Sequence, residues 1–240
     1  MNSRLEVHKP EFEAGAPPNF DGLAPFYRWM EALSFGPWLW WCRCAFLNEM
    51  MRARKALTFG DGDGRFTARL LAKNRAVRVD AIDASPAMLE ALKRRTGQCS
   101  GRVRTEVADA RSWNESDPAS RPDQPYDLVY THFFLDCLSR DEVRRLATRA
   151  RSLISPTGIW VVSEFAIPES GMGRLVAQPL VSFLYWAFGV LTGLKVRCLP
   201  NYGLALRHAG FALRQRRTWL MGLLVSDVWS LAEPTHLKDS

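Results

Sequence analysis

The pattern of apolar and polar positions changes period repeatedly from residue 55 onward. Short apolar runs predict strands, and apolar residues at three- and four-residue spacing between them predict helices. Such alternation is typical of βαβ units around a parallel sheet. The expected strands cover residues 56–59, 77–82, 103–107, 126–131, 158–165, 211–218 and 223–229.

Capping residues indicate where the predicted helices begin. Ser85 can accept hydrogen bonds from free backbone N–H groups, and Pro86 loses no needed donor at the first helical position. Ser139 and Glu142 form a capping box. Gly210 is suited to end a helix, because glycine adopts the backbone conformation that follows a last turn. The helices are expected at about residues 64–74, from 85 onward, at 139–153 and at 201–209.

Two segments outside this alternation, residues 20–51 and 172–197, are rich in aromatic and apolar residues. We expect them to pack together as a helical cap. The apolar stretch 180–194 is shorter than the roughly 20 residues of a membrane span, so a buried helix or one side of an apolar pocket is favoured. The predicted organisation is a flexible N-terminus (1–19), a cap segment (20–54) and an α/β domain (55–240) with a cap insertion at about 168–200.

Composition and charge change this picture little. Apolar residues make up 47% and charged residues 24% of the chain, as in ordinary globular proteins. The net charge of +7 would suit an anionic partner, but the basic residues are scattered, which favours a solvated surface. The five cysteines predict neither a disulfide framework nor a metal site. The first 15 residues lack the apolar core of a signal peptide, so a cytoplasmic location is expected.

Closely spaced glycines follow the first predicted strand, at Gly60, Gly62 and Gly64. Glycine permits tight turning and close approach of a ligand, and the helix that follows offers unpaired N–H groups. Acids end the next two strands: Asp83 is placed to accept hydrogen bonds from ribose hydroxyls, and Asp109 from an adenine amino group. Taken alone, the glycines also fit a plain tight turn. Together, the three features predict a nucleoside site at the carboxyl edge of the sheet.

Residues 58–66, 83–89 and 107–110 resemble the glycine-rich, ribose-binding and adenine-binding motifs of class I S-adenosylmethionine-dependent methyltransferases, especially the small-molecule group related to ubiquinone and menaquinone methyltransferases. The resemblance implies a Rossmann-like α/β fold whose seven-stranded, mostly parallel sheet has an antiparallel last strand. It implies S-adenosyl-L-methionine as cofactor, and residues 20–27 resemble a lid over it. The cofactor-binding residues implied are Tyr27, Gly60, Asp61, Gly62, Gly64, Asp83, Ala84, Met88, Asp109, Ala110, Thr131 and His132.

One position departs from the family pattern. Many members carry an acid two positions before the first motif glycine, where this chain has Thr58. That acid helps to hold the methionine amino group in relatives, so the way in which this chain holds it is open. Asp61 or Asp63 could compensate.

His132, just after the fourth predicted strand, is the candidate catalytic residue. Imidazole titrates near neutral pH and could remove a proton from the acceptor, although contact with the cofactor or capping of the strand end are alternatives. Methyl transfer depends mainly on alignment and exclusion of water, so a base is optional. The aromatic cap segments favour a small apolar or aromatic acceptor. The candidate pocket residues are Tyr27, Trp38, Glu164, Tyr185, Trp186 and Tyr202.

The sequence also raises three other functions. A nucleic-acid methyltransferase is disfavoured, because residues 130–133 (Tyr-Thr-His-Phe) match neither Asp/Asn-Pro-Pro-Tyr nor a Pro-Cys nucleophile. A dinucleotide-dependent oxidoreductase is disfavoured because its fingerprint is GxGxxG rather than GxGxG. A non-catalytic binding protein of the same fold stays open. No nucleic-acid partner, metal or membrane span is expected, while association with a membrane surface and the oligomeric state stay open.

Overall fold

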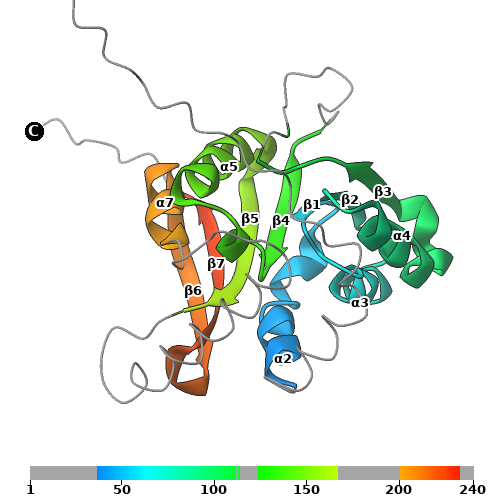
Figure 1. The fold of residues 1–240 in the computed structure, drawn as a ribbon, viewed down its shortest axis with the longest axis horizontal. Helices are drawn as coiled ribbons and strands as arrows, with labels where there is room; N and C mark the ends of the chain where they lie inside the picture. Colours follow the sequence, from blue (N-terminus) through cyan, green and yellow to red (C-terminus); the bar gives the residue numbers. More distant parts are fainter. Residues whose placement is uncertain (1–36, 112, 114–123, 167–200, 233–240) are drawn as a thin grey trace, which may run out of the picture.

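The structure, a computed structural model, describes residues 37–111, 113, 124–166 and 201–232 (Figure 1). These residues form one seven-stranded sheet in the order β3-β2-β1-β4-β5-β7-β6. Strands β1 to β5 pair in parallel, whereas β7 is antiparallel to both β5 and β6, which confirms the predicted Rossmann-like sheet. The strands are β1 (Lys55–Phe59), β2 (Arg78–Asp83), β3 (Val103–Val107), β4 (Tyr126–His132), β5 (Ile154–Phe165), β6 (Phe211–Trp219) and β7 (Leu224–Leu231).

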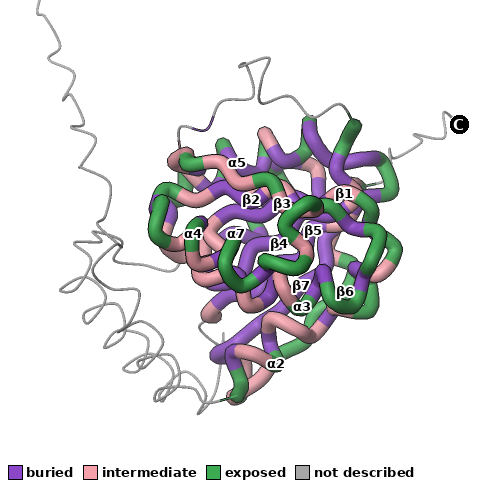
Figure 2. The backbone as a smooth tube through the Cα atoms, turned by 90° about the vertical axis from the view of Figure 1, so that its right-hand side faces the viewer, coloured by how far each residue is buried: buried purple, intermediate pink, exposed green. Residues whose placement is uncertain are grey.

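Helices cover both faces of the sheet (Figures 1 and 2). On one face α5 and α7 pack over buried residues such as Val129 and Trp160. On the other face α3 packs over Leu128 and Tyr130, and α4 packs over Ala81. The helices are α2 (Trp38–Cys44), α3 (Arg65–Lys73), α4 (Pro86–Arg95), α5 (Arg140–Leu153) and α7 (Tyr202–His208), with 3₁₀ turns η1 (Glu49–Arg52), η2 (Gly97–Arg102), η3 (Leu135–Cys137) and η4 (Leu220–Gly222).

The predicted helix caps are confirmed. Ser85 Oγ accepts a hydrogen bond from the backbone N–H of Met88 at 3.3 Å. At the start of α5, Ser139 Oγ accepts from the N–H of Glu142 at 3.4 Å, and Glu142 Oε2 accepts from the N–H of Ser139 at 2.7 Å. Backbone N–H groups in the first turn of a helix have no partner within the helix, and these caps supply acceptors for them.

Strand β5 begins earlier than predicted, at Ile154 instead of residue 158. Ile154 on β5 pairs with Tyr126 on β4, and the register of this pairing shifts before Ile159 pairs with Leu128. Gly158 lies inside this irregularity, where a Cβ atom would approach the carbonyl oxygen of Tyr126 to 2.9 Å. Alternation of apolar residues did not mark this part of the strand because Pro156 and Thr157 are exposed.

The cap predicted from the aromatic segments falls only partly within the described residues. Helix α2 packs against β6 and β7, and the Cys42 thiol donates to the carbonyl oxygen of Val225 at 3.4 Å. The predicted insertion at 168–200 and the expected lid at 20–27 lie outside the described residues. Within the described ranges, no helix has the length and apolar character needed to cross a membrane.

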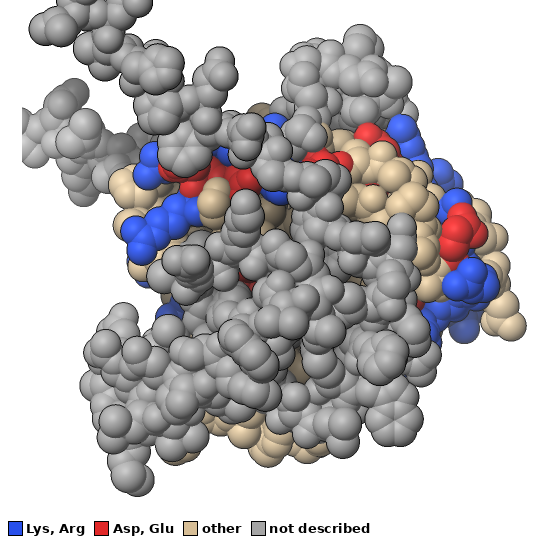
Figure 3. Space-filling view, in the orientation of Figure 1, with Lys and Arg blue, Asp and Glu red and all other residues tan. Residues whose placement is uncertain are grey.

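In Figure 3, the Lys and Arg side chains of the described residues that are visible lie beside Asp and Glu side chains toward the sides of the view. The sheet ends on β6, which among the described strands pairs with β7 alone. Arg214, Arg216 and Arg217 stand at exposed positions of this edge strand. The pairing with β7 shifts register between Leu213 and Gln215, which is a bulge at the edge.

Candidate functional site

The loop between β1 and α3 contains three glycines with left-handed backbone conformations. The φ angles are +62° at Gly60, +60° at Gly62 and +73° at Gly64, values that favour glycine over any other residue. A Cβ atom at Gly60 would collide with the ring of Phe134, and one at Gly64 would meet Leu92 at 2.6 Å. A Cβ atom at Gly62 would have no described atom within 4 Å. Among the described residues, the loop is thus packed at Gly60 and Gly64 and open at Gly62, where a ligand could approach the backbone.

The two predicted nucleoside-binding acids lie at the same edge of the sheet as this loop. Phe59 at the end of β1 pairs with Ile82, and Asp83 pairs with Val107 at the end of β3. Asp83 Oδ1 accepts a hydrogen bond from the backbone N–H of Ser85 at 2.8 Å, which orients the carboxylate. Ala84, directly after this acid, is exposed. The structure therefore brings the glycine loop, Asp83 and the end of β3 together.

Asp109 is engaged by an arginine that the sequence patterns did not single out. Arg111 donates through Nε and Nη2 to Asp109 Oδ2 at 2.8 and 2.6 Å, and its backbone N–H donates to Oδ1 at 2.9 Å. Partial burial alone would raise the pKa of Asp109, but the hydrogen bonds and charge of Arg111 lower it below its ordinary value. Asp109 therefore remains an ionised acceptor at neutral pH.

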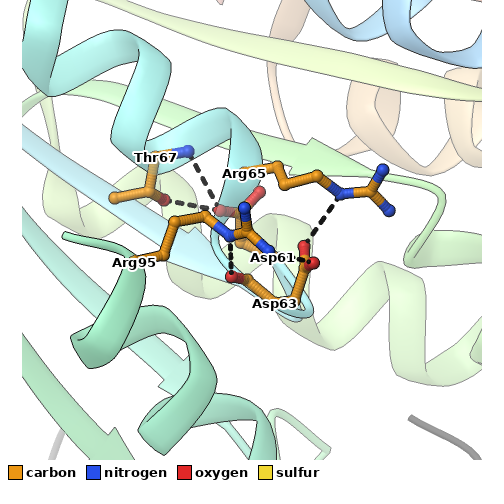
Figure 4. Close-up of polar contacts among 5 residues, drawn as sticks. All are labelled: Asp61, Asp63, Arg65, Thr67 and Arg95. Carbon is orange, nitrogen blue, oxygen red and sulfur yellow. Dashed lines mark hydrogen bonds and ion pairs between the residues drawn. The ribbon is translucent and has the colours of Figure 1, made fainter. Parts of the chain in front are cut away.

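The two acids of the glycine loop differ in their partners (Figure 4). Asp61 Oδ2 accepts from both the backbone N–H and the hydroxyl of Thr67, at 3.1 and 2.6 Å. The Thr67 hydroxyl in turn lies 2.6 Å from the hydroxyl of Tyr130. Burial raises the pKa of Asp61 to about 6. Asp63 instead forms ion pairs with Arg65 at 3.1 Å and Arg95 at 2.8 Å.

Thr58, at the position where relatives carry an acid, is buried beneath the loop. It is 1% exposed, and its hydroxyl donates to the carbonyl oxygen of Tyr130 at 2.9 Å. The side chain therefore ties β1 to β4 and supplies no charge.

His132 ends β4 as a buried and neutral side chain. It is 4% exposed, and its ring packs edge-on against Phe66 with the ring centroids 4.4 Å apart. Neither ring nitrogen has a hydrogen-bond partner among the described residues. Burial, followed by the charge of Arg43, lowers the pKa of His132 well below its ordinary value. The desolvated interior disfavours the charged form of this imidazole, so its surroundings differ from those of an ordinary histidine that titrates near neutral pH.

The segment after β4 crosses the glycine loop, a contact that sequence reasoning missed. Phe133 has a φ of +55°, which is strained for a residue other than glycine. The next ring, Phe134, covers Gly60 and stacks on Phe59 with centroids 6.3 Å apart. Aromatic residues at these positions gave no sequence signal, because their role depends on the turn that follows β4.

Glu164 holds this segment from the end of β5. Its Oε1 accepts from the backbone N–H groups of Phe134 at 3.0 Å and Leu135 at 2.7 Å, and its Oε2 has no hydrogen-bond partner in the described part of the chain. Burial, with the nearby charge of Asp136, raises the pKa of Glu164 well above its ordinary value. Burial also raises the pKa of Asp136 to about 6. Glu164 is thus buried and holds the segment after β4, and its predicted place in the acceptor pocket stays a prediction.

Thr131, Ala110 and Met88, which are also predicted to bind the cofactor, differ in how far they are buried. The Thr131 hydroxyl accepts from Trp160 Nε1 at 3.1 Å, within the buried core. Ala110 is 8% exposed next to Asp109, and Met88 is partly buried in the first turn of α4.

The predicted acceptor pocket is not assembled by the described residues. The Tyr202 hydroxyl donates to Asp227 at 2.9 Å, and Arg216 pairs with the same buried carboxylate at 2.8 and 2.7 Å, so this hydroxyl is used in a structural cluster. Trp38 is 37% exposed on α2 and lies edge-to-face with Trp41, with centroids 4.9 Å apart. Tyr27, Tyr185 and Trp186 lie outside the described residues. No metal-binding group of His, Cys, Asp and Glu occurs within the described ranges.

Comparisons with known proteins agree on the nature of this domain. Residues 57–160 match the family described as "Methyltransferase domain". The chain is 31% identical over 127 residues to trans-aconitate 2-methyltransferase from Methylobacterium radiotolerans, an alignment covering 52% of this chain and 44% of the relative. The chain thus spans less than half the length of this curated relative.

Solved structures of methyltransferases share the fold. An O-methyltransferase family protein from Burkholderia thailandensis superposes with a TM-score of 0.66 at 17% identity, covering 87% of this chain and 59% of that protein. Human N-acetylserotonin methyltransferase in complex with S-adenosylmethionine has a TM-score of 0.62 at 16% identity, covering 89% of this chain and 57% of that one. Residues 57–160 of this chain therefore match a methyltransferase domain, and the chain shares the fold of solved methyltransferases.

Proposed function

We propose that this chain transfers a methyl group from S-adenosyl-L-methionine to a small-molecule acceptor. The observation that carries the proposal is the meeting of three motifs at one edge of the sheet: the glycine loop, Asp83 and Asp109. A backbone with positive φ and open space at Gly62 suits close approach of a ligand. The open middle of the loop and the two acids fit a nucleoside with a charged amino-acid tail.

Each of these residues has a separate task toward the cofactor. Asp83, oriented by the Ser85 N–H, would accept hydrogen bonds from the ribose hydroxyls. Asp109, kept ionised by Arg111, would accept one from the adenine amino group. When bound, S-adenosylmethionine supplies a methyl group on a positively charged sulfur. The chain's own contribution is to align the acceptor with that group and to exclude water.

His132 is assigned to hydrogen bonding within the site. As a neutral imidazole it offers one donor and one acceptor, and both nitrogens lack a partner in the described part of the chain. Its lowered pKa makes it a weak base, so the transfer does not depend on an initial proton abstraction by this residue.

The proposed acceptor is a small apolar or aromatic molecule. Trp38 and Trp41 are 37% and 49% exposed on α2, and exposed aromatic side chains commonly mark contact surfaces. The proteins found by comparison include a trans-aconitate methyltransferase and an N-acetylserotonin methyltransferase, so their names indicate no common acceptor atom.

Calorimetric titration tests the cofactor half of the proposal. S-adenosylhomocysteine is expected to bind and NAD is not. Asp83→Ala should weaken binding by about 1–3 kcal/mol, because a hydrogen-bonded acid is lost. Asp141→Ala, at an exposed position of α5, serves as the matched control and should leave the affinity unchanged. Equal affinity of wild type and Asp83→Ala would contradict the ribose assignment.

A panel of acceptors tests the other half. Transfer of labelled methyl groups is measured with phenolic, quinol-like, lipid and polar acceptors and with nucleic acid. We expect transfer to an aromatic or apolar member. Methylation of a polar metabolite alone would overturn the acceptor class, and methylation of DNA or RNA would replace the small-molecule proposal.

A further inference from the structure

The glycine loop contains two acids separated by one residue, and the fold uses them differently (Figure 4). The carboxylate of Asp63 forms ion pairs with Arg65 and Arg95. Arg95 also donates a hydrogen bond to the backbone carbonyl oxygen of Asp63 at 3.0 Å. Asp63 therefore fastens the loop to α4. Asp61 forms no ion pair with any described residue, and the same oxygen, Oδ2, accepts both of its hydrogen bonds from Thr67. Its Oδ1 accepts no hydrogen bond within the described ranges.

The environment of Asp61 is that of a carboxylate prepared for a cation. It is the residue before Gly62, where a Cβ atom would have no described neighbour within 4 Å, and Thr67 fixes its orientation from the first turn of α3. Thr67 is braced by the hydroxyl of Tyr130 on β4. A partly desolvated carboxylate with one unused oxygen gains most from a positively charged partner, because its own charge is poorly solvated.

The proposed cofactor brings such a partner. The amino-acid end of S-adenosylmethionine, and of its product S-adenosylhomocysteine, carries an α-ammonium group. Thr58 supplies no charge beneath the loop, and Asp109 is committed to Arg111. We propose, resting on the function proposed above, that Asp61 holds the α-ammonium of the cofactor, whereas Asp63 has the structural task of bracing the loop against α4.

A comparison of two variants and two ligands tests this assignment. The ligands are S-adenosylhomocysteine and its analogue in which hydrogen replaces the α-amino group. Asp61→Asn keeps an oxygen that can accept from Thr67 but loses the charge. It should weaken binding of S-adenosylhomocysteine by about 10- to 100-fold, the range for a charged hydrogen bond, and leave the analogue within about threefold. Asp63→Asn removes a brace of the loop and no proposed ligand contact, so any change in affinity should be the same, within about threefold, for the two ligands.

The outcomes separate this proposal from the preceding one. If the wild type binds neither ligand, the proposed function fails. If the wild type binds S-adenosylhomocysteine but Asp61→Asn weakens both ligands equally, or weakens neither, the ammonium assignment is wrong while the function stands. Thermal unfolding of both variants accompanies the titrations, so that a folding defect is recognised.

A pH series on the wild type gives an answer even if Asp61→Asn does not fold. The groups facing Asp61 are Thr67 on α3, Tyr130 on β4, Arg43 on α2 and Asp63 in the loop. Because the pKa of Asp61 is about 6, the carboxylate is ionised above that pH and protonated below it. The affinity ratio of S-adenosylhomocysteine to the deaminated analogue should fall by up to about tenfold per pH unit below about pH 6. A ratio that is constant from about pH 8 to about pH 5 would overturn the proposal.

Discussion

At the scale of single residues, the glycine loop shows how two glycines with nearly equal φ angles have different roles. Gly60 and Gly62 both have φ near +60°, yet the first lies under the Phe134 ring and the second borders open space. At Gly60, the ring of Phe134 leaves no room for a side chain. At Gly62 no described atom lies within 4 Å of a Cβ position, and we expect the proposed ligand to approach the backbone there.

Replacing each glycine by alanine should separate stability from binding. Both variants incur a conformational cost of about 1 kcal/mol, and Gly60→Ala adds about 1–3 kcal/mol because its Cβ collides with Phe134. Gly62→Ala should remain well folded but bind S-adenosylhomocysteine poorly. Chemical unfolding and calorimetry measure the two effects. Equal losses of stability in the two variants would contradict the packing argument.

At the scale of elements, local sequence signals specified helix starts well. Ser85 and the pair Ser139 and Glu142 cap their helices as predicted, because a cap depends on residues within one turn of each other. The start of β5 was misplaced, since the pairing of Ile154 with Tyr126 is made between residues distant in sequence. The same reason explains why the contact of Phe134 with Gly60 was missed.

The cap of α5 can be tested directly. Ser139→Ala should lower the free energy of unfolding by about 1 kcal/mol, because the N–H of Glu142 loses its acceptor. Thr148→Ala, at an exposed position in the same helix, is the control and should be neutral or slightly stabilising, since alanine is the better helix former. Denaturant unfolding gives both values. Comparable losses in the two variants would assign the effect to the helix in general rather than to the cap.

At the scale of the whole molecule, the sequence was sufficient for the sheet and for the edge on which the motifs meet. Gly60, Asp83 and Asp109 could be located because each lies at the end of a predicted strand or within two residues after it. The protonation states could not be predicted. The neutral His132, the ionised Asp109 and the raised pKa of Glu164 depend on burial and on partners such as Arg111 and Asp136, which only the folded chain brings together.

Those protonation states predict how Glu164 affects stability at different pH. Its pKa is raised in the folded state, so the folded protein holds this proton more tightly than the unfolded chain does. Its contribution to the free energy of unfolding is therefore fully present below the unfolded pKa and is lost as pH rises through the folded pKa. Glu164→Gln keeps an oxygen that accepts from Phe134 and Leu135 but cannot ionise.

The variant should consequently be more stable, relative to wild type, at about pH 8 than at about pH 5. Unfolding free energies of both proteins across this range provide the measurement. His132 contributes in the opposite direction, with stability lost as pH falls, but equally in both proteins, so the difference reports Glu164 together with the neighbouring carboxyl group of Asp136. A difference that does not vary with pH would mean that Glu164 is ionised in the folded protein.

The arginines on β6 have a consequence for how this molecule meets its own copies. An unpaired sheet edge offers hydrogen-bonding groups to any strand that passes, and bulges or charged side chains are the usual protection against such growth. Arg214 and Arg217, together with the bulge beside Leu213, give the edge strand β6 both protections, whereas the charge of Arg216 is balanced by Asp227. We therefore expect the positive charge on β6 to disfavour strand-by-strand association between copies of the chain at this edge.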